Sequence, residues 1–391
     1  MLFGKMRPKI LFVTHELAPD GGGGLVASWI LQALLSAYDV TLLAWTAPDP
    51  AALDDKFGTS LAGSRVPLLR PSAAARLLID CIPDQDNHQR ANYLVRMAKR
   101  LRKNFDAVLA CGFESDLGPP AIQYLHYPYL QRRSATWPIP GDAPLPVLVR
   151  GLLSGRLRPW LLISGYSFER MRRNFTLVNS WWTLGQASGL EGAVLYPPAP
   201  GVFPDVPWAE RQDAFVCTGR LVAYKRQDWV VETLALVRRE WPGLELHICG
   251  SVPKVPYRKR LLDLAWRHGS WVHLHDDLPR RDLTRLLASS RYGIHACINE
   301  HFGIAPAEMA RAGCIPFVHS SGGQVEIVDR DPRLCFNSAE DAAAKILVVL
   351  RSPAMQDELR AAVYARSGRF TPEAFVSGLL DHVARFIRAV R

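Results

Sequence analysis

The stretch GIHACINEHFGIAPAE, residues 293–308, shows the unit from which this chain is built. Residues 293–297 are apolar enough for a buried strand, Gly303 interrupts the run, and Pro306 stands where the first turn of a helix tolerates proline. We therefore predict a strand, a turn and a helix. A near-continuous apolar strand followed by a helix is the repeating unit of a parallel sheet covered on both faces.

The same alternation runs outward from this stretch in both directions. Strands are predicted at 9–14, 40–44, 107–110, 121–125, 160–164, 176–179 and 193–196, and again at 214–218, 245–249, 272–274, 293–297, 315–318 and 334–336. Helices are predicted from about residue 25, at 88–105, 227–240, 257–268, 281–289, 307–312 and 339–351, and last at 372–390. The fold class is therefore α/β.

Prolines interrupt the alternation near the middle of the chain. They stand at positions 197, 198, 200, 204 and 207. Such a stretch continues neither a helix nor a central strand. We predict a Rossmann-like domain over 1–200, a second over 201–370 and a C-terminal helix over 371–391 that packs back. The two parallel sheets would face each other across a cleft, with ligands beyond the carboxyl ends of their strands.

Charge and cysteine usage exclude several classes of protein. The net charge of +10 is evenly spread, because residues 1–205 carry 21 Lys and Arg against 16 Asp and Glu, and residues 206–391 carry 26 against 21. No basic tail indicates nucleic-acid binding. The seven cysteines are scattered and never form C-x-x-C, which favours a reducing compartment. Since no segment resembles a signal peptide or a membrane span, we expect a soluble, cytoplasmic protein.

One segment, residues 88–105, concentrates positive charge without any acid. Its apolar residues recur at helical spacing, so it predicts an amphipathic helix with a basic face. Such a face fits a solvated surface helix, a contact with an anionic membrane surface or a phosphorylated acceptor.

Four glycines, residues 21–24, follow the first predicted strand. Gly22 and Gly23 would let backbone amides approach a ligand, and the following helix N-terminus would favour an anion. Ala27 stands where Gly-x-Gly-x-x-Gly requires a glycine, which argues against a dinucleotide site. A flexible turn is the alternative interpretation.

Arg220 and Lys225 follow the first strand of the second half. Two cations at the carboxyl end of a sheet suit a diphosphate, with a bidentate guanidinium and a point-charge ammonium. The alternative is a pair of solvated loop cations.

Glu300 and Glu308 bracket the turn of the opening stretch. Both carboxylates can accept hydrogen bonds from hydroxyl groups and are predicted to face the cleft, while the amides of Gly303 and Ile304 can meet phosphate oxygens. Glu308 as a surface residue and Glu300 as a helix cap are the alternatives.

Other candidate motifs are weaker, and no metal site is predicted. The Asp-x-Asp patterns at 84–86 and 329–331 lie beside prolines and are typical of turns. His273 and His275 share one face of a strand without a clear third ligand. A Gly-x-Ser-x-Gly elbow is missing, which argues against serine hydrolase chemistry.

Together these motifs resemble the retaining GT-B glycosyltransferases of family 4, which use nucleotide-sugar donors. Glu300 and Glu308 match the family's E-x7-E motif, and Arg220 and Lys225 look like its diphosphate clamp. Within the family, five features resemble the mannosyltransferases that extend dolichol-linked oligosaccharides with GDP-mannose. They are the four glycines at 21–24, LHYP at 125–128, VNSWWT at 178–183, YPP at 196–198 and NEHFGI at 299–304.

The resemblance implies a role for each candidate residue. As catalytic residues, Arg220 and Lys225 would neutralise the donor diphosphate, Glu300 would orient sugar hydroxyls, and His126 would lie beside the transferred sugar. The substrate-binding residues would be Gly22, Gly23, Gly303, Ile304 and Glu308, the last at the ribose. No protein nucleophile, metal or cofactor is expected, since the nucleotide sugar is a co-substrate and cations take the place of Mg²⁺ at the diphosphate.

The resemblance also implies the partners. We expect a lipid-linked or polysaccharide acceptor, no nucleic acid, and a peripheral contact with the inner membrane face through the basic helix. A UDP-sugar donor and a non-catalytic nucleotide-sugar-binding subunit are the alternatives. The chain departs from those relatives because no N-terminal membrane anchor is expected and Gln324 replaces a proline.

Overall fold

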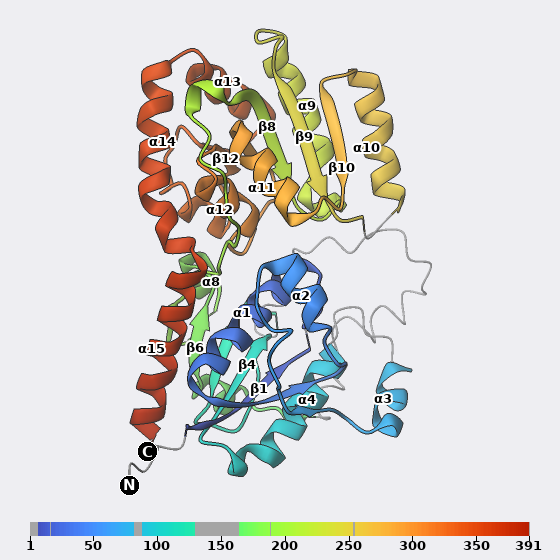
Figure 1. Ribbon diagram of the computed structural model, residues 1–391, viewed down its shortest axis with the longest axis vertical. Helices are drawn as coiled ribbons and strands as arrows, with labels where there is room; N and C mark the ends of the chain where they lie inside the picture. Colours follow the sequence, from blue (N-terminus) through green and yellow to red (C-terminus); the bar gives the residue numbers. More distant parts are fainter. Residues whose placement is uncertain are drawn as a thin grey trace.

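The computed structural model describes residues 7–15, 17–81, 88–129, 164–187, 189–252 and 255–390. These residues form two lobes stacked along the long axis of the molecule, each with its own sheet (Figure 1). The Asp-x-Asp pattern at 84–86 and, apart from Ser164, the predicted strand at 160–164 lie outside the described residues.

The N-terminal lobe holds a seven-stranded, fully parallel sheet in the order β3-β2-β1-β4-β5-β6-β7. Its strands are β1 (Lys9–Thr14), β2 (Asp39–Ala44), β3 (Leu68–Leu69), β4 (Ala107–Gly112), β5 (Ile122–Leu125), β6 (Phe175–Val178) and β7 (Gly192–Val194). Its helices are α1 (Gly21–Ala37), α2 (Pro50–Phe57), α3 (Ala73–Asp80), α4 (His88–Leu101), α7 (Phe168–Arg172) and α8 (Trp181–Gln186). The central strand β1 is buried along nearly its whole length, as its apolar composition predicts.

The C-terminal lobe holds a six-stranded parallel sheet in the order β10-β9-β8-β11-β12-β13. Its strands are β8 (Gln212–Thr218), β9 (Glu245–Gly250), β10 (Val272–Asp276), β11 (Ser290–His295), β12 (Ile315–His319) and β13 (Cys335–Phe336). Its helices are α9 (Gln227–Arg238), α10 (Val255–His268), α11 (Arg280–Ser289), α12 (Ile304–Arg311), α13 (Ala339–Leu350) and α14 (Pro353–Ser367). Both strand orders reverse beside the first strand of the lobe, which is the doubly wound pattern.

The predicted α/β fold of two Rossmann-like parallel sheets is confirmed. Three differences are informative. The helix α1 begins at Gly21, earlier than predicted, so the four glycines form its first turn and not a loop. The helix α12 also begins early, at Ile304, which keeps Pro306 inside the first turn. The edge strand β3 and the helices α2, α3, α7, α8 and α14 were not predicted.

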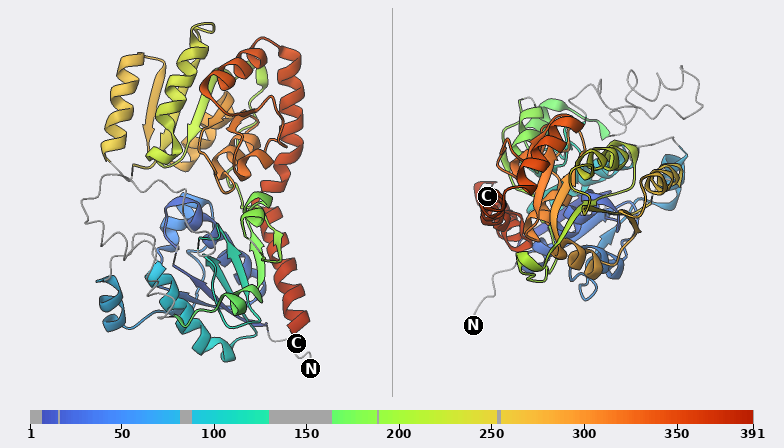
Figure 2. Two further views of the ribbon diagram at one scale, coloured as in Figure 1. Left: turned by 180° about the vertical axis from the view of Figure 1, so that it is seen from behind. Right: turned by 90° about the horizontal axis from the view of Figure 1, so that it is seen from above.

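The last helix, α15 (Pro372–Val390), leaves the C-terminal lobe and returns to the N-terminal lobe. It runs along one side of the molecule in both views (Figure 2). Its apolar face buries Phe375, Leu379, Val383 and Ile387 in the same core as α1. The prediction of a C-terminal helix that packs back is therefore confirmed, whereas the exact domain boundaries remain a prediction.

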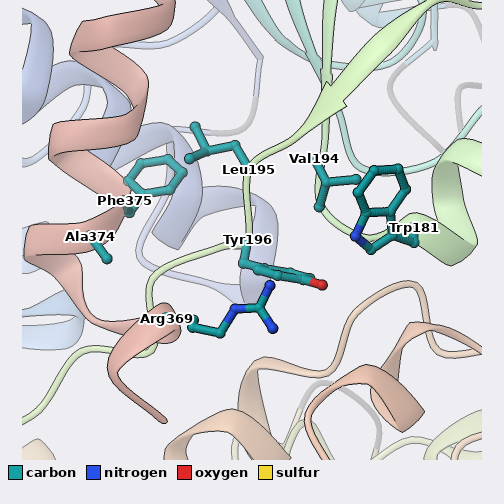
Figure 3. Close-up of a pocket in the computed structure, with 7 residues that line it drawn as sticks. All are labelled: Trp181, Val194, Leu195, Tyr196, Arg369, Ala374 and Phe375. Atoms are coloured by element: carbon teal, nitrogen blue, oxygen red, sulfur yellow. The ribbon is translucent and has the colours of Figure 1, made fainter. Parts of the chain in front are cut away.

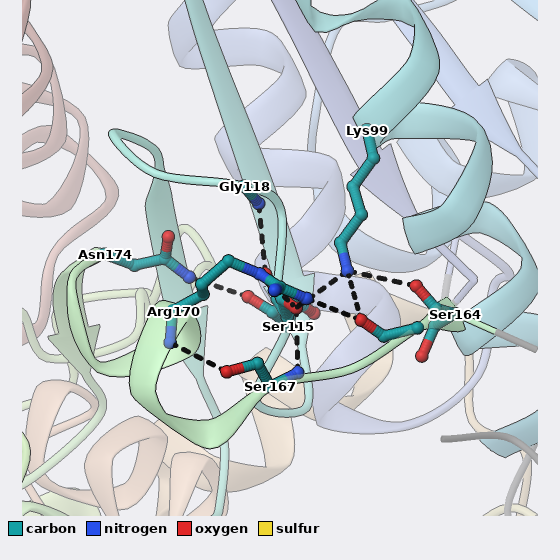
Figure 4. A network of polar contacts seen from close by, with 9 residues as sticks. Lys99, Ser115, Gly118, Ser164, Ser167, Arg170 and Asn174 are labelled. Atoms are coloured by element: carbon teal, nitrogen blue, oxygen red, sulfur yellow. Dashed lines mark hydrogen bonds and ion pairs between the residues drawn. The ribbon is translucent and has the colours of Figure 1, made fainter. Parts of the chain in front are cut away.

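The predicted basic face of α4 is partly directed inward. Lys99 forms an ion pair of 2.7 Å with the fully buried Asp116, which also pairs with Arg170 at 2.8 Å (Figure 4). Arg90 pairs with Asp80 at 2.9 Å. Burial alone would raise the pKa of Asp116, but Arg170 and Lys99 outweigh it and hold that pKa below its usual value. Part of the basic helix therefore serves the core of its own lobe.

Two further features concern the surface and the thiols. Among the described residues, we find no helix that combines the length and the apolar character needed to cross a membrane. All seven cysteines are free thiols, and all but Cys81 are buried. Six of the seven thiols therefore pack as small apolar side chains inside the protein.

Candidate active site

The loops after β1 and β8 meet where the two lobes touch. A Cβ atom on Gly21 would lie 3.9 Å from the guanidinium carbon of Arg220, and one on Gly22 would lie 3.0 Å from the Ile304 Cδ1. Glycine at position 22 thus allows a close approach of the two lobes, because a side chain there would press against Ile304 of the other lobe. The structure brings together three residues that the sequence predicted separately: Gly22, Arg220 and Ile304.

Two helix N-termini point into this junction. The helix α1 starts at Gly21 and α12 starts at Ile304 after Gly303, and neither has a side-chain cap for its first amides. Gly303 has φ of 100°, a left-handed conformation that favours glycine. Uncapped amides at a helix N-terminus attract anions through both hydrogen bonding and the helix dipole. The junction is therefore built to receive negative charge from both lobes.

Lys225 and Glu300 form a buried ion pair at the edge of the junction. Lys225 lies in the short turn before α9, and Glu300 follows β11. His295, the last residue of β11, places its Nε2 3.0 Å from the Oε2 of Glu300. The backbone of Glu300 is held as well, because its carbonyl accepts a hydrogen bond of 2.7 Å from the amide of Gly323. Two side chains thus hold the carboxylate, and the Gly323 amide holds the backbone of the same residue.

This environment keeps both partners charged. Burial would raise the pKa of Glu300, but the charge of Lys225 and the contact with His295 overcome it and hold that pKa well below the usual range. Burial would lower the pKa of Lys225, yet Glu300 raises it above its ordinary value. Glu300 is therefore a carboxylate at neutral pH, suited to accept hydrogen bonds and not to donate a proton.

Arg220 extends the positive side of the junction. Its Nη2 donates a 2.6 Å hydrogen bond to the hydroxyl of Tyr224, and the ammonium of Lys225 lies 5.6 Å from the centre of the same ring. The tyrosine thus lies against both cations and orients them. Only a single turn of chain separates Arg220 from Lys225, so one loop presents both charges.

Glu308 occupies a different environment from Glu300. Its Oε1 is 2.7 Å from the Nη2 of Arg280, and the residue is only 6% exposed. Arg280 also donates a hydrogen bond to the carbonyl of Pro200 in the proline-rich segment. The two carboxylates of the E-x7-E motif therefore have separate partners, Lys225 and His295 for Glu300 and Arg280 for Glu308.

His301 of the C-terminal lobe lies near His126 and against Tyr127 of the N-terminal lobe. His126 follows β5, and its Nε2 lies 3.4 Å from the Cys111 Sγ. His301 stacks on Tyr127 at a ring-centre distance of 4.2 Å, and burial lowers the pKa of His301 to about 4, with Lys225 and His126 adding to the effect. His126 thus lies within electrostatic range of His301, beside the Lys225–Glu300 pair.

Glu326 links the two lobes, and the sequence alone did not single it out. Its carboxylate accepts hydrogen bonds from the amides of Trp181 and Trp182, at 3.1 and 2.8 Å, and from the hydroxyl of Tyr196 at 3.0 Å. Ser180 adds a hydrogen bond to the carbonyl of His301 at 2.5 Å. The motifs at 178–183 and 196–198 were noted in the sequence, but nothing in their spacing shows that they meet at Glu326.

Gln324 has a structural role in the same loop. Its Nε2 donates to the carbonyl oxygens of Cys297, His319 and Ser321 at 2.7, 3.0 and 3.0 Å, and the side chain is fully buried. This glutamine therefore fastens its loop to the segment that follows β11 by hydrogen bonds.

Three side chains at this site could bind a metal ion, but Lys225 would compete with that ion for the Glu300 carboxylate. The side chains of His295, Cys297 and Glu300 place one ligand atom each within 4.8 Å of one another. The ammonium of Lys225 already neutralises the Glu300 carboxylate, so the position is served by a protein cation. The second Asp-x-Asp pattern is also paired with arginines, Asp329 with Arg366 and Asp331 with Arg333, as a charged turn would be.

A cavity of about 250 Å³ lies behind the junction, between β7 and α15. Its lining includes Trp181, Tyr196 and Arg369 (Figure 3). None of the predicted site residues lines it. The chemistry is therefore argued from the charged junction and not from this cavity.

Comparison with known proteins agrees with this geometry. Residues 202–366 match the model of the family described as glycosyl transferases group 1, so the C-terminal lobe carries a domain of that type. The human GDP-Man:Man(3)GlcNAc(2)-PP-Dol alpha-1,2-mannosyltransferase is 27% identical over 240 residues, which cover 54% of this chain and 48% of the human protein. The protein of that name from Yarrowia lipolytica is 24% identical and is covered over 36% of its length. The chain thus spans about half or less of these relatives.

Solved structures share the whole architecture. HepE of Anabaena, crystallised with UDP and glucose, superposes with a TM-score of 0.65 at 15% identity, covering 97% of this chain and 100% of that one. Sucrose-phosphate synthase from Thermosynechococcus elongatus superposes with a TM-score of 0.68 at 16% identity, covering 98% of this chain and 100% of that one. At such identities the likeness concerns the fold, and it confirms the predicted GT-B arrangement.

Proposed function

We propose that this chain is a retaining hexosyltransferase that moves mannose from GDP-mannose to a lipid-linked or polysaccharide acceptor. One observation carries the proposal: Arg220, the Lys225–Glu300 pair and the uncapped N-termini of α1 and α12 converge at the junction of the lobes. Converging donors of positive charge suit the diphosphate of a nucleotide sugar. The mannose and the guanine base rest on the similarity to the mannosyltransferases.

The proposed step needs stabilisation of a departing diphosphate. The bond between the anomeric carbon and the diphosphate oxygen breaks with its electron pair on that oxygen. The acceptor hydroxyl oxygen bonds to the same face of the anomeric carbon, and its proton passes to the leaving diphosphate. Arg220, Lys225 and the helix amides would neutralise the negative charge as it grows, which is the largest kind of contribution that such a site makes. No protein nucleophile is assigned.

The two glutamates would hold hydroxyl groups and not transfer protons. Glu300 stays ionised, since Lys225 and His295 hold its pKa well below the usual range, so it can accept hydrogen bonds from the sugar. Glu308, fixed by Arg280, would accept hydrogen bonds from the ribose. The two glutamates therefore need not act as the acid and the nucleophile or base of a glycoside hydrolase.

We further propose that the reaction needs no metal ion, because a buried ammonium already lies where a metal would meet Glu300. Transfer should persist after chelation by EDTA and dialysis. Loss of transfer in metal-free protein, restored by Mg²⁺ or Mn²⁺, would contradict this part of the proposal.

Donor choice is tested by thermal denaturation with GDP, UDP and ADP, and then with their common sugars. A ligand at 100 times its dissociation constant stabilises by about 2.7 kcal/mol, a readily measured shift in Tm. GDP and GDP-mannose should give the largest shift. A larger shift with UDP ligands would support the UDP-sugar alternative, and binding without transfer to any lipid-linked oligosaccharide would support a non-catalytic subunit.

A peripheral membrane contact is proposed for the face formed by α3 and α4. Leu77 and Leu78 of α3 are 69% and 71% exposed, and α3 contacts α4, which carries the exposed cations Arg96 and Arg100. Apolar side chains flanked by cations suit an anionic lipid surface. We expect the protein to co-sediment with anionic vesicles but not with neutral ones, and we expect less co-sedimentation for a Leu77→Ser, Leu78→Ser variant. Equal co-sedimentation with both kinds of vesicle, or equal co-sedimentation of the variant and the wild-type protein, would contradict the proposal.

A further inference from the structure

The edge of the C-terminal sheet carries a cluster of imidazoles outside the candidate active site. The strands β9 and β10 run side by side at that edge (Figure 1). His273 and His275 lie on β10, and the sequence indicates no clear third ligand for them. The structure corrects this, because the neighbouring strand β9 supplies His247 and Glu245.

The register of the two strands brings these side chains together on one face of the sheet. His247 and His273 are directly opposite partners in the parallel ladder. Their rings stack at a centre distance of 4.7 Å and an interplanar angle of 20°. The His247 Nδ1 lies 3.1 Å from the His275 Nε2, and the His273 Nε2 lies 3.0 Å from the Glu245 Oε2. Four potential ligands therefore lie on two adjacent strands.

The chemistry of this donor set is that of a transition-metal site. Glu245, His247 and His273 each place one ligand atom within 4.8 Å of the others. Imidazole nitrogens with one carboxylate oxygen are ligands that Zn²⁺ and its neighbours prefer. Glu245 stands at the amino end of β9, away from the carboxyl ends that carry the candidate active site, so these groups are not part of the donor site.

One imidazole nitrogen of this cluster has no hydrogen-bond partner among the described residues. The Nε2 of His247 is buried and has no hydrogen-bond partner. Such buried polar atoms are rare, and each requires an explanation such as an ion that binds there. His273 and Glu245 keep 36% and 50% of their side chains exposed, which leaves a path for an ion from solvent.

We infer that Glu245, His247 and His273 bind a divalent transition-metal ion, with Zn²⁺ as its representative, and that His275 positions His247. The bound ion would join β10 to β9 by side-chain bonds in addition to the backbone ladder. Because the cluster lies at the edge of the sheet and away from the candidate active site, the ion would have a structural role. The proposed transferase activity would not depend on its binding.

The test is a Zn²⁺ titration of the full chain against a fluorescent zinc chelator at neutral pH. Cys81→Ser serves as the parent, because Cys81 is an exposed thiol that could bind zinc by itself. Loss of an outer-shell partner alone weakens metal affinity about 10- to 100-fold, so Glu245→Gln and His273→Asn should each weaken it at least ~10-fold. The matched control is His268→Gln, a histidine of the same lobe that pairs with Glu232 at 3.2 Å, and it should bind as the parent does.

A second measurement separates ligation from a general effect on folding. Co²⁺ bound to the parent should give visible absorption bands of a four-coordinate site, and His273→Asn should lose them while its far-ultraviolet circular dichroism stays unchanged. A parent that binds no Zn²⁺, or variants that bind Zn²⁺ with the affinity of the parent, would overturn the inference. Glu245→Gln keeps the test decisive if His273→Asn fails to fold, because Glu245 is a half-exposed strand-end residue.

Discussion

The Lys225–Glu300 pair allows structural and catalytic roles to be separated by experiment. Both side chains are only 16% exposed, so replacing Lys225 by Met would leave the Glu300 carboxylate buried without its counter-charge. Removing one partner of a buried ion pair costs about 3–5 kcal/mol. Because His295 still lies 3.0 Å from the carboxylate, we expect the lower end, about 3 kcal/mol, for Lys225→Met. Glu300→Gln would leave the Lys225 ammonium without its counter-charge, and it should lower the free energy of unfolding by a similar amount.

The double variant gives the decisive number. Lys225→Met with Glu300→Gln removes both charges together, so its cost should fall short of the sum of the single costs by about 2–3 kcal/mol. Urea unfolding at pH 7, followed by tryptophan fluorescence, measures this coupling free energy. Transfer activity should behave differently: it should fall about 10²- to 10³-fold in Lys225→Met and stay low in the double variant, because the diphosphate still lacks its cation.

Two outcomes would refute this reasoning. Additive costs, within about 0.5 kcal/mol, would show that the two charges do not stabilise each other in the folded protein. Activity restored together with stability in the double variant would show that Lys225 acts only through the fold.

The pH dependence of stability supplies an independent check on Glu300. Its pKa is lower in the folded protein than the ordinary value of about 4.3, so the stabilisation is complete above that value and is lost as the pH falls through the lowered folded pKa. Glu300→Gln should therefore lose less stability on acidification below about pH 4 than the wild-type protein does. Parallel stability–pH curves would contradict this expectation.

Three further variants test other parts of the structure. Asp116→Asn should destabilise the N-terminal lobe by about 3 kcal/mol, because Lys99 and Arg170 lose a fully buried counter-charge, and an unchanged urea midpoint would count against it. Glu326→Gln should speed hydrogen exchange at the two α8 amides that its carboxylate holds by at least ~10-fold, since hydrogen bonds to charged groups contribute about 1.5–3 kcal/mol. Equal exchange would show that the contact does not hold the lobes. Gly22→Val should raise the donor KM about tenfold, because its Cβ would lie 3.0 Å from Ile304, and adding Ile304→Ala should relieve the defect. A donor KM that changes neither in Gly22→Val nor in the double variant with Ile304→Ala would contradict this close approach.

Apolar runs predicted the sheets well because a parallel strand is buried on both faces and leaves a continuous signal. All predicted strands that fall on described residues are present, β1 with its exact bounds. The strand β3 was missed because two residues, Leu68 and Leu69, are too short to show a period. The glycines of α1 were assigned to a loop because their intrinsic preference opposes a helix, and packing of the rest of α1 overrides it.

The site residues were found by type and by position after a strand, but their partners were not. Glu300, Lys225 and Arg220 were each singled out, whereas the pairing of Glu308 with Arg280 could not be foreseen. Glu326 was not singled out from the sequence, yet it holds α8 of the other lobe through two amides.

Sequence by itself determined the α/β class, the alternation of strand and helix, and the identity of the charged residues beyond the strand ends. Those properties depend on local burial and local chain direction, which hydrophobic pattern and proline positions record directly. Only the tertiary structure decided which surfaces of the two lobes meet. It placed Gly22 against Ile304 of the other lobe, and it brought His247 into a cluster with His273. Such contacts join residues far apart in the chain, and strand order and register, which no local pattern encodes, bring them together.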